Sequence, residues 1–388
     1  MTALQSAQTL ELRREVRRFL AEERARGTVL GRPDSWLTGW LPEFSRRLAE
    51  RGWVGMALPK EYGGGGLGFL ARVVVIEELL AAGAPVSAHW VADRQAAPSI
   101  LNHGSEEQKK RFLPAIAEGR CFFSIGMSEE QAGSDLAGVQ TRAERVEGGW
   151  RLTGTKKWTG GAHCNDYAIV LARTSEHEDR HQGLSQFIVD LRAPGVRVEP
   201  IHLLTGEHTF NYFHLDGVEV PDGMLLGNEG DGWAQVTGEL AFERSGPERY
   251  LSTFPLLVAL VRELSDKPAT ADQQARLGAL IARLYAVRQL SLGVAAALDE
   301  GRPADVQAAL VKDLGTRLEG ELVHEVRRIL PVAPDAEATP GTYPELLALA
   351  LLHTPAYTLR GGTNEILRGI ITRAVEHVEH VEHKEQQS

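Results

Sequence analysis

Cysteine is scarce in this 388-residue chain: Cys121 and Cys164 are its only two, and they match neither a disulfide framework nor a zinc site. Long basic runs are missing, and the net charge of −10 argues against a nucleic-acid partner. No apolar run approaches the ~18 residues of a membrane span, and the first 23 residues carry four glutamates, unlike a transit peptide. We therefore expect a globular protein with no metal, no membrane association and a cytoplasmic location.

The chain has enough apolar residues for a large core, with 43% hydrophobic and 24% charged residues, and its length favours two or three domains. Its hydrophobic period changes twice. From Leu10 to about Gly119 it is helical, and Ser105 with Gln108 has the spacing of a capping box. From about 120 to 230 the period is two, with β-branched and aromatic runs separated by glycine turns, which predicts an antiparallel β domain. Helical patterns return at Trp233 and continue to about Val378.

Five motifs in this order make the chain resemble the acyl-CoA dehydrogenase family. They are "ALPKEYGGGGLG" (57–68), "HGSEEQKKRFLPAIAEG" (103–119), "SIGMSEEQAGSDLAG" (124–138), "GTKKWTGGA" (154–162) and "GGTNEILRGIITRA" (361–374). The resemblance runs nearly end to end. It implies a mostly α protein with a central β domain: a helical bundle over residues 1–120, an antiparallel, barrel-like β domain over 121–231 and a four-helix bundle over 232–388.

The family's activity implies an oxidoreductase of lipid and fatty acid metabolism. Its members are FAD flavoproteins that convert an acyl-CoA thioester to a trans-2-enoyl-CoA. In the middle domain the resemblance implies cofactor contacts from Met127, Ser128 and Ser134, the last also near substrate. Taken alone, this stretch reads equally well as a polar loop between strands.

Trp158 is expected to lie against the flavin face, although a core tryptophan would give the same local pattern. The common family pattern has a hydroxyl residue two positions later, where this chain has Gly160. We expect either Thr159 or a backbone amide to supply that hydrogen bond.

The stretch "LRGGTNEILRG" (359–369) is a site where glycines allow close approach of a ligand to backbone at a helix start. The resemblance places Thr363, Asn364 and Glu365 near the flavin or its phosphates, and a backbone N–H near Gly361 against the thioester oxygen. Many family members have their catalytic glutamate at the position of Gly361. Glycine cannot remove a proton, so the base must come from elsewhere or the chain is inactive.

A second position for the base occurs in isovaleryl-type, long-chain-type and bacterial sterol-side-chain-type members, directly before an arginine. Here Glu243 precedes Arg244 in "GELAFERSGPERY". We therefore expect Glu243 to be the α-proton base, with Arg244 contacting substrate, although an ordinary solvated helical glutamate is the alternative. Glu239 lies one turn earlier without matching the motif. The second position favours branched or bulky acyl groups, and a Gly361→Glu change would restore the first one if the backbone accepts a side chain.

Assembly is expected to depart from the common homotetramer, because the Arg-x-x-Phe-Gly and Gly-Gly-x-Gly stretches that bind the adenylate across subunits are missing. The expected partners are acyl-CoA, electron-transferring flavoprotein as acceptor, and either a second copy (dimer or tetramer) or a related subunit in an α2β2 tetramer. Arg283 and Arg288 are candidates for a cross-subunit phosphate contact, with interhelical pairing as the alternative. Two other functions stay open: a flavin monooxygenase or oxidase of the same fold, and a non-catalytic subunit that completes a partner's FAD site.

Overall fold

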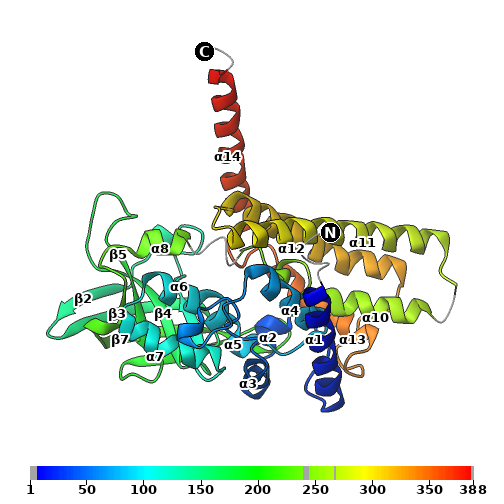
Figure 1. Ribbon diagram of the computed structural model, residues 1–388, viewed down its shortest axis with the longest axis horizontal. Coiled ribbons are helices and arrows are strands. Elements are labelled where there is room, and N and C mark those ends of the chain that lie inside the picture. The colour runs from blue at the N-terminus through cyan, green and yellow to red at the C-terminus, as the bar shows by residue number, and fades with distance from the viewer. Residues whose placement is uncertain (1–6, 239–243, 266–267, 386–388) are drawn as a thin grey trace. The chain divides into compact units, whose positions relative to one another are not determined.

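The computed structural model describes residues 7–238, 244–265 and 268–385, with side chains up to Val375. The chain divides into two compact units (Figure 1). One, here called the helical unit, comprises Met1–Asp34, Val73–Ala84 and Leu240–Ser388. The other, the sheet unit, comprises Ser35–Arg72 and Pro85–Glu239.

The sheet unit is built on one eight-stranded sheet in which β1 lies off the path β6-β7-β3-β2-β4-β5-β8. The long strands β3 and β7 form the middle of the antiparallel part, and valines, leucines and phenylalanines on alternate positions fill its core. The strands are β1 (Phe123–Gly126), β2 (Arg142–Val146), β3 (Gly149–Gly160), β4 (Tyr167–Arg173), β5 (Leu184–Asp190), β6 (Val196–His202), β7 (His208–Pro221) and β8 (Leu225–Leu226).

Two strands share one edge of β4. β1 pairs with its first half in parallel, Phe123 opposite Tyr167, and β2 meets its end, Arg142 opposite Arg173. The segment that joins β1 to β2, residues 127–141, must therefore leave the sheet and return to the same edge. This excursion, called the β1–β2 loop below, carries three of the predicted site residues.

Helices of the sheet unit cover the β1 end of the sheet. Phe112 of α7 packs edge-on against Phe123 of β1, with ring centroids 5.5 Å apart. The expected capping box is present at the start of α7, because the Ser105 side chain accepts from the Gln108 backbone and the Gln108 side chain accepts from the Ser105 backbone. The helices are α2 (Ser35–Thr38), α3 (Pro42–Glu50), η2 (Lys60–Tyr62), α5 (Ser87–Val91), η3 (Ala92–Ala96), α6 (Ala97–His103), α7 (Glu106–Ala117), η4 (Leu136–Gly138), η5 (Asp222–Met224) and α8 (Gly232–Gly238).

The helical unit is a bundle in which α12 touches α10, α11, α13 and α14. Its last helix starts against α12 and then extends away from the bundle (Figure 1). The helices are α1 (Ala7–Ala25), most of α4 (Phe69–Ala81), η6 (Pro247–Arg249), α10 (Phe254–Ser265), α11 (Ala271–Asp299), α12 (Asp305–Ile329), α13 (Tyr343–His353), η7 (Thr354–Ala356) and α14 (Asn364–Glu385).

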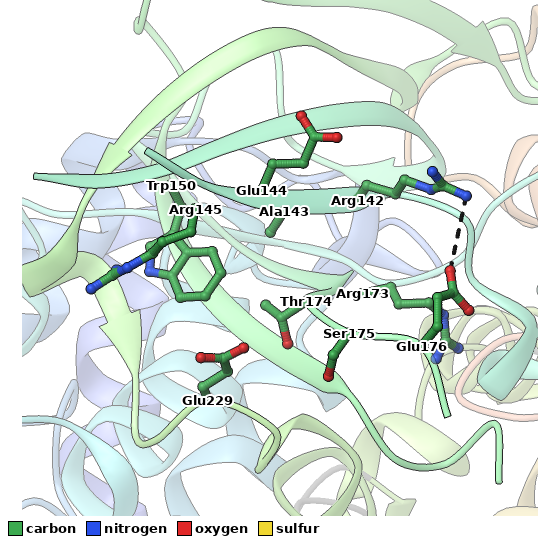
Figure 2. A pocket seen from close by; sticks show the side chains of 10 residues that line it. All are labelled: Arg142, Ala143, Glu144, Arg145, Trp150, Arg173, Thr174, Ser175, Glu176 and Glu229. Carbon is green, nitrogen blue, oxygen red and sulfur yellow. Dashed lines mark ion pairs between the residues drawn. The ribbon is translucent and has the colours of Figure 1, made fainter. Parts of the chain in front are cut away.

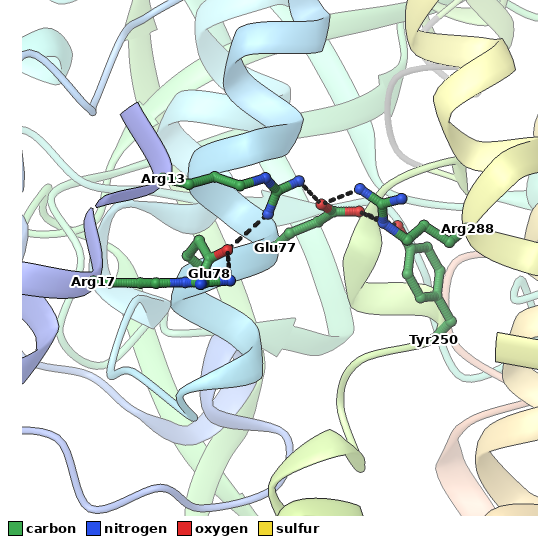
Figure 3. A network of polar contacts seen from close by, with 6 residues as sticks. All are labelled: Arg13, Arg17, Glu77, Glu78, Tyr250 and Arg288. Atoms are coloured by element: carbon green, nitrogen blue, oxygen red, sulfur yellow. Dashed lines mark hydrogen bonds and ion pairs between the residues drawn. The ribbon is translucent and has the colours of Figure 1, made fainter. Parts of the chain in front are cut away.

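A polar network joins the N-terminal and C-terminal parts of the helical unit (Figure 3). Glu77 of α4 accepts two hydrogen bonds from Arg288 of α11, at 2.6 and 3.0 Å, and one from Arg13 of α1. The neighbouring Glu78 binds Arg13 and Arg17. Bidentate Arg–carboxylate pairs fix orientation as well as adding energy, so this network holds α1 and α4 against the C-terminal helices.

The fold predicted from the sequence is confirmed: helices precede and follow a central, mostly antiparallel sheet. Two pairings, β1 with β4 and β2 with β4, are parallel instead. The boundaries at 120 and 231 stay a prediction.

One helix departs from the sequence-based expectation about membranes. By length and composition, α11 is apolar enough to cross a membrane, with 33% of the relevant window buried. This is weak evidence for a span, because a core helix of a soluble protein passes the same test. In the structure α11 packs along α12 as part of the bundle.

Candidate active site

The predicted site residues fall into two sets, one on each unit. In the sheet unit, the β1–β2 loop is hydrogen-bonded to β3 at the residue before Trp158. The backbone N–H of Lys157 donates to the carbonyl of Ser128 at 2.8 Å. Met127 packs partly buried between two hydrophobic clusters, whereas Ser134 is exposed farther along the loop. The structure thus brings Met127 and Ser128 beside the Trp158 segment of β3.

A buried ion pair anchors this loop. Lys156, fully buried on β3, donates to Glu129 at 2.7 Å and to the Met127 carbonyl at 3.2 Å. Glu129 also accepts from the backbone N–H groups of Gln140 and Thr141 and from the Thr141 hydroxyl. Burial alone would raise the pKa of Glu129, but Lys156 and these hydrogen bonds hold it below its usual value. Both ends of the loop are therefore tied to one carboxylate.

Lys156→Met is expected to destabilise the protein by about 3–5 kcal/mol, because it leaves a buried carboxylate without its cation. FAD binding should weaken as well, since the loop loses its anchor. The measurements are chemical denaturation and FAD dissociation. Lys157→Met is the matched control, because Lys157 makes an exposed pair with Glu130 and should cost at most about 1 kcal/mol. Equal losses in the two variants would contradict this role for Lys156.

Trp158 lies on a β-bulge in an unusual backbone conformation. Lys156 pairs with Phe213 and Thr159 with Asn211, so two residues of β3 face one residue of β7. Its φ of 61° is strained for a bulky side chain, and such strain is concentrated at functional sites. The indole is 51% exposed and packs edge-on against Phe210 at 5.8 Å. The bulge therefore presents a half-exposed indole, with the Lys157 ammonium 5.5 Å from its ring centroid, and an exposed aromatic ring suits stacking on a planar one.

The residues that follow Trp158 differ in how they could reach a cofactor. Thr159 is fully buried, and its hydroxyl has no hydrogen-bond partner among the described residues. A Cβ at Gly160 would meet only the Phe210 ring, at 3.7 Å, which is ordinary contact. Packing therefore does not require glycine there. The predicted role of Thr159 stays a prediction, with its hydroxyl enclosed in the sheet unit.

In the helical unit, two arginines line the glycine turn before α14. Gly361 and Gly362 both have left-handed φ values, 69° and 82°. A Cβ at Gly361 would lie 2.7 Å from Arg249 Nη2, and one at Gly362 would lie 3.1 Å from Arg244 Nη2. The structure thus brings the predicted residues Gly361 and Arg244 into one turn and adds Arg249, which the sequence motifs do not single out.

The three predicted residues in the first turn of α14 lie in different environments. Thr363 caps the helix by accepting from the backbone N–H of Ile366 at 3.4 Å. Asn364 is buried, with its Oδ1 bound to Lys312 at 2.6 Å, so its side chain contacts α12. Glu365 is exposed. Contacts of these residues with a flavin stay a prediction.

The predicted base, Glu243, and its neighbour Glu239 lie outside the described residues. The structure also identifies functional candidates that the motifs did not reveal: Lys156, Arg249 and Lys312. Lys156 could have been found from the sequence, because the alternation of apolar and polar residues along this strand places a lysine at a position that faces inward. For Arg249 and Lys312 no local pattern distinguishes a buried cation from a surface one.

Arg283 and Arg288 are both paired within the helical unit. Arg288 binds Glu77 of α4, and Arg283 binds Glu321 of α12. This is the interhelical alternative stated for them above. Across the described residues, no group of histidine, cysteine and acidic side chains is arranged to hold a metal ion.

A pocket on the sheet unit lies away from the predicted residues (Figure 2). Trp150, at the start of β3, and three arginines form part of its lining, together with acidic side chains. None of the predicted site residues lines it, and its cations are matched by three glutamates. Its lining residues are Arg142, Ala143, Glu144, Arg145, Trp150, Arg173, Thr174, Ser175, Glu176 and Glu229.

Comparison with known proteins identifies the family. Its domain models match as the acyl-CoA dehydrogenase N-terminal domain over residues 6–120, the middle domain over 124–218 and the C-terminal domain over 230–376. The chain therefore belongs to the acyl-CoA dehydrogenase family, and the resemblance inferred from the motifs is confirmed.

Individual relatives are similar along most of this chain. Acyl-CoA dehydrogenase FadE34 of Mycobacterium tuberculosis is 34% identical over 329 residues, which are 84% of this chain but only 45% of that protein. The structure of the Tcur3481-Tcur3483 steroid ACAD has a TM-score of 0.86 at 27% identity, covering 97% of this chain and 99% of that one. The ChsE4-ChsE5 complex from Mycobacterium tuberculosis has a TM-score of 0.80 at 30% identity, covering 96% and 97%.

Family membership makes the protein an oxidoreductase that acts on acyl-CoA, with FAD as its cofactor. The structure offers features that fit such a group. In the sheet unit, the exposed Trp158 indole on its strained bulge suits a flat aromatic ring. In the helical unit, Gly361 and Gly362 expose backbone that no Cβ covers. When bound, FAD supplies the hydride acceptor of the reaction.

Proposed function

We propose that the protein introduces an α,β double bond into an acyl-CoA, with Glu243 as the base that removes the α proton. One observation carries this proposal: the chain has glycine, with no carboxylate, at the other family position, and the left-handed φ of Gly361 strains any side chain placed there. Arg244, directly after Glu243 in the sequence, has its guanidinium beside Gly362. The proposed base, Glu243, is therefore the sequence neighbour of a residue, Arg244, whose side chain contacts the glycine turn.

The remaining roles are assigned to this chain's own groups. Backbone N–H groups near Gly361 would hydrogen-bond the thioester oxygen, and such a preorganised donor is typically worth about 3 kcal/mol in the transition state. Trp158 would cover one face of the ring system and exclude water. Met127, Ser128, Ser134, Thr159 and the first turn of α14 are the proposed FAD contacts, an assignment that rests on the family resemblance.

The proposed substrate is a branched or bulky acyl-CoA. One observation supports this choice: a similar structure is described as a steroid ACAD. The proposed base at the second family position agrees with it. Electron-transferring flavoprotein is the proposed acceptor and the cytoplasm the proposed location. Both rest on the family resemblance and the composition.

We also propose that the active assembly contains a related subunit. A similar structure is a complex of two named chains, ChsE4 and ChsE5. On α11, the side chains of Ile281 and Tyr285, which are one turn apart on the same face, are 50% and 62% exposed. Apolar side chains gathered on one helix are a common mark of a protein interface. This surface suits a second chain of the same fold.

The test is a turnover assay with a dye or electron-transferring flavoprotein as acceptor, on the protein alone and co-expressed with the related subunit. A panel of branched, steroidal and straight-chain acyl-CoAs should yield a product lacking two hydrogens at the α and β carbons. Rapid oxygen consumption with a hydroxylated product would favour the monooxygenase, and rapid oxygen consumption with release of hydrogen peroxide would favour the oxidase. Activity that survives Glu243→Gln in the co-expressed complex would assign the base to the partner.

A further inference from the structure

A buried lysine is bound to the glycine turn and the start of α14. Lys312 of α12 is fully buried, and its Nζ donates to the carbonyl of Thr358 at 3.0 Å, the carbonyl of Gly362 at 2.6 Å and Asn364 Oδ1 at 2.6 Å. A lysine ammonium has three hydrogens, and here three acceptors lie within hydrogen-bond distance. All three belong to residues 358–364, called the glycine-turn segment below.

These contacts determine which way the turn's peptide groups point. Because a peptide is planar and trans, a Gly362 carbonyl directed at Lys312 turns the N–H of Thr363 away from it. The backbone N–H of Asn364 donates back to the Thr358 carbonyl at 3.1 Å, which closes the segment on itself. The positive φ values of Gly361 and Gly362 allow this path. Lys312 thus holds Thr358, Gly362 and Asn364 at once.

We propose that Lys312 is a positioning residue that fixes the glycine-turn segment through its ammonium hydrogens, and that loss of its proton releases the segment. A neutral amine has two hydrogens and a lone pair, so one of three acceptors would lose its donor and face that lone pair. The proposal extends the function proposed above, because the backbone N–H groups assigned to the thioester oxygen belong to this segment.

The charges around Lys312 make this proton easy to lose. Burial lowers its pKa most, followed by the positive charges of Arg249, Arg244 and Arg360, while Asp313 acts in the opposite direction; the pKa falls to about 7. Arg360 is itself bound to Asp34, at 2.5 and 2.6 Å. Asp313 is shared with Arg317 and Arg368. Titration of Lys312 therefore falls within the range where the enzyme is assayed.

The effects of pH on the segment and on the whole fold have opposite signs. The folded pKa of Lys312 lies below that of an exposed lysine, so between the two values the unfolded chain binds more protons. Its contribution to stability therefore grows as the pH rises above about 7. In the same interval the glycine-turn segment loses a hydrogen bond. Release of the glycine-turn segment as the pH rises, without a matching loss of global stability, would therefore distinguish deprotonation of Lys312 from unfolding of the whole protein.

The test is amide hydrogen exchange of the full-length protein between pH 6 and pH 8.5, corrected for the intrinsic pH dependence of exchange. Protection of amides in residues 359–366 is expected to fall about tenfold across this range, the effect of losing one charge-assisted hydrogen bond. In Lys312→Met, protection there should be low and independent of pH. Lys157→Met, which changes a partly exposed lysine of the sheet unit, should keep the wild-type profile.

Turnover provides a second readout. In Lys312→Met, kcat should fall about tenfold with KM little changed, because the N–H groups of the segment act mainly in the transition state. The wild-type decline of kcat above about pH 7 should disappear in this variant. A wild-type exchange profile that is flat with pH, or the same pH dependence in Lys312→Met, would overturn the proposal. Because exchange needs no substrate, its outcome does not depend on whether the protein oxidises acyl-CoA.

Discussion

Glu243→Gln is expected to reduce the rate of flavin reduction by acyl-CoA by ~10²–10⁴-fold, the usual cost of removing a general base. The amide is nearly isosteric with the carboxylate, so the fold, the bound FAD and the affinity for acyl-CoA should be retained. Stopped-flow absorbance of the purified variant, mixed anaerobically with its best substrate, measures the effect directly.

Glu239→Gln is the matched control, because Glu239 is expected one turn earlier on the same helix face and does not precede an arginine. The flavin of this variant should be reduced by acyl-CoA at close to the wild-type rate. Near-normal flavin reduction in Glu243→Gln would show that another group removes the α proton. Equal losses in both variants would indicate a general effect of charge in this segment of the chain.

Gly361→Ala is expected to destabilise the protein by roughly 2–4 kcal/mol, which combines strain at a positive φ with overpacking. The new methyl would lie 2.7–3.0 Å from three atoms of the Arg249 guanidinium, and Arg249 is buried. Denaturant titration of the variant gives the change in unfolding free energy.

Gly301→Ala separates the two causes. Gly301 has nearly the same φ, 67°, with no atom within 4 Å of a Cβ. Gly301→Ala should therefore lower the free energy of unfolding only by the cost of a side chain at a positive φ, about 1 kcal/mol. The excess in Gly361→Ala reports the contact with Arg249, and equal costs would contradict that contact.

The same geometry corrects one sequence-based expectation. Gly361→Glu had been expected to restore a carboxylate at the first family position, provided that the backbone accepts a side chain. The left-handed φ strains any side chain at this position, and its Cβ would have to displace the Arg249 guanidinium. We expect no rescue of Glu243→Gln by Gly361→Glu.

The sequence predicted the order of helices and strands well because its signals are local. The Ser105 capping box and the period-two runs from 120 to 230 depend only on neighbouring residues. The pairing of both β1 and β2 with β4 was not predictable in this way. It depends on contacts between residues far apart in the sequence, Phe123 with Tyr167 and Arg142 with Arg173.

At the candidate site, motifs singled out residues but not the charges that lie beside them. The importance of Gly361 was visible in the sequence, whereas its reason, the Arg249 guanidinium against it, required the fold. Lys156 and Lys312 appear in sequence as ordinary lysines. Each becomes distinctive only when its burial and its polar neighbours are known, since a buried cation must find its acceptors within reach.

Anaerobic titration of the purified yellow protein with the acyl-CoA panel tests the central claim most directly. We predict that a branched or steroidal acyl-CoA bleaches the visible flavin band at stoichiometric addition, faster than butyryl-CoA does, and yields the corresponding trans-2-enoyl-CoA. A flavin band that no acyl-CoA bleaches, in the protein alone or joined to a related subunit, would contradict the claim.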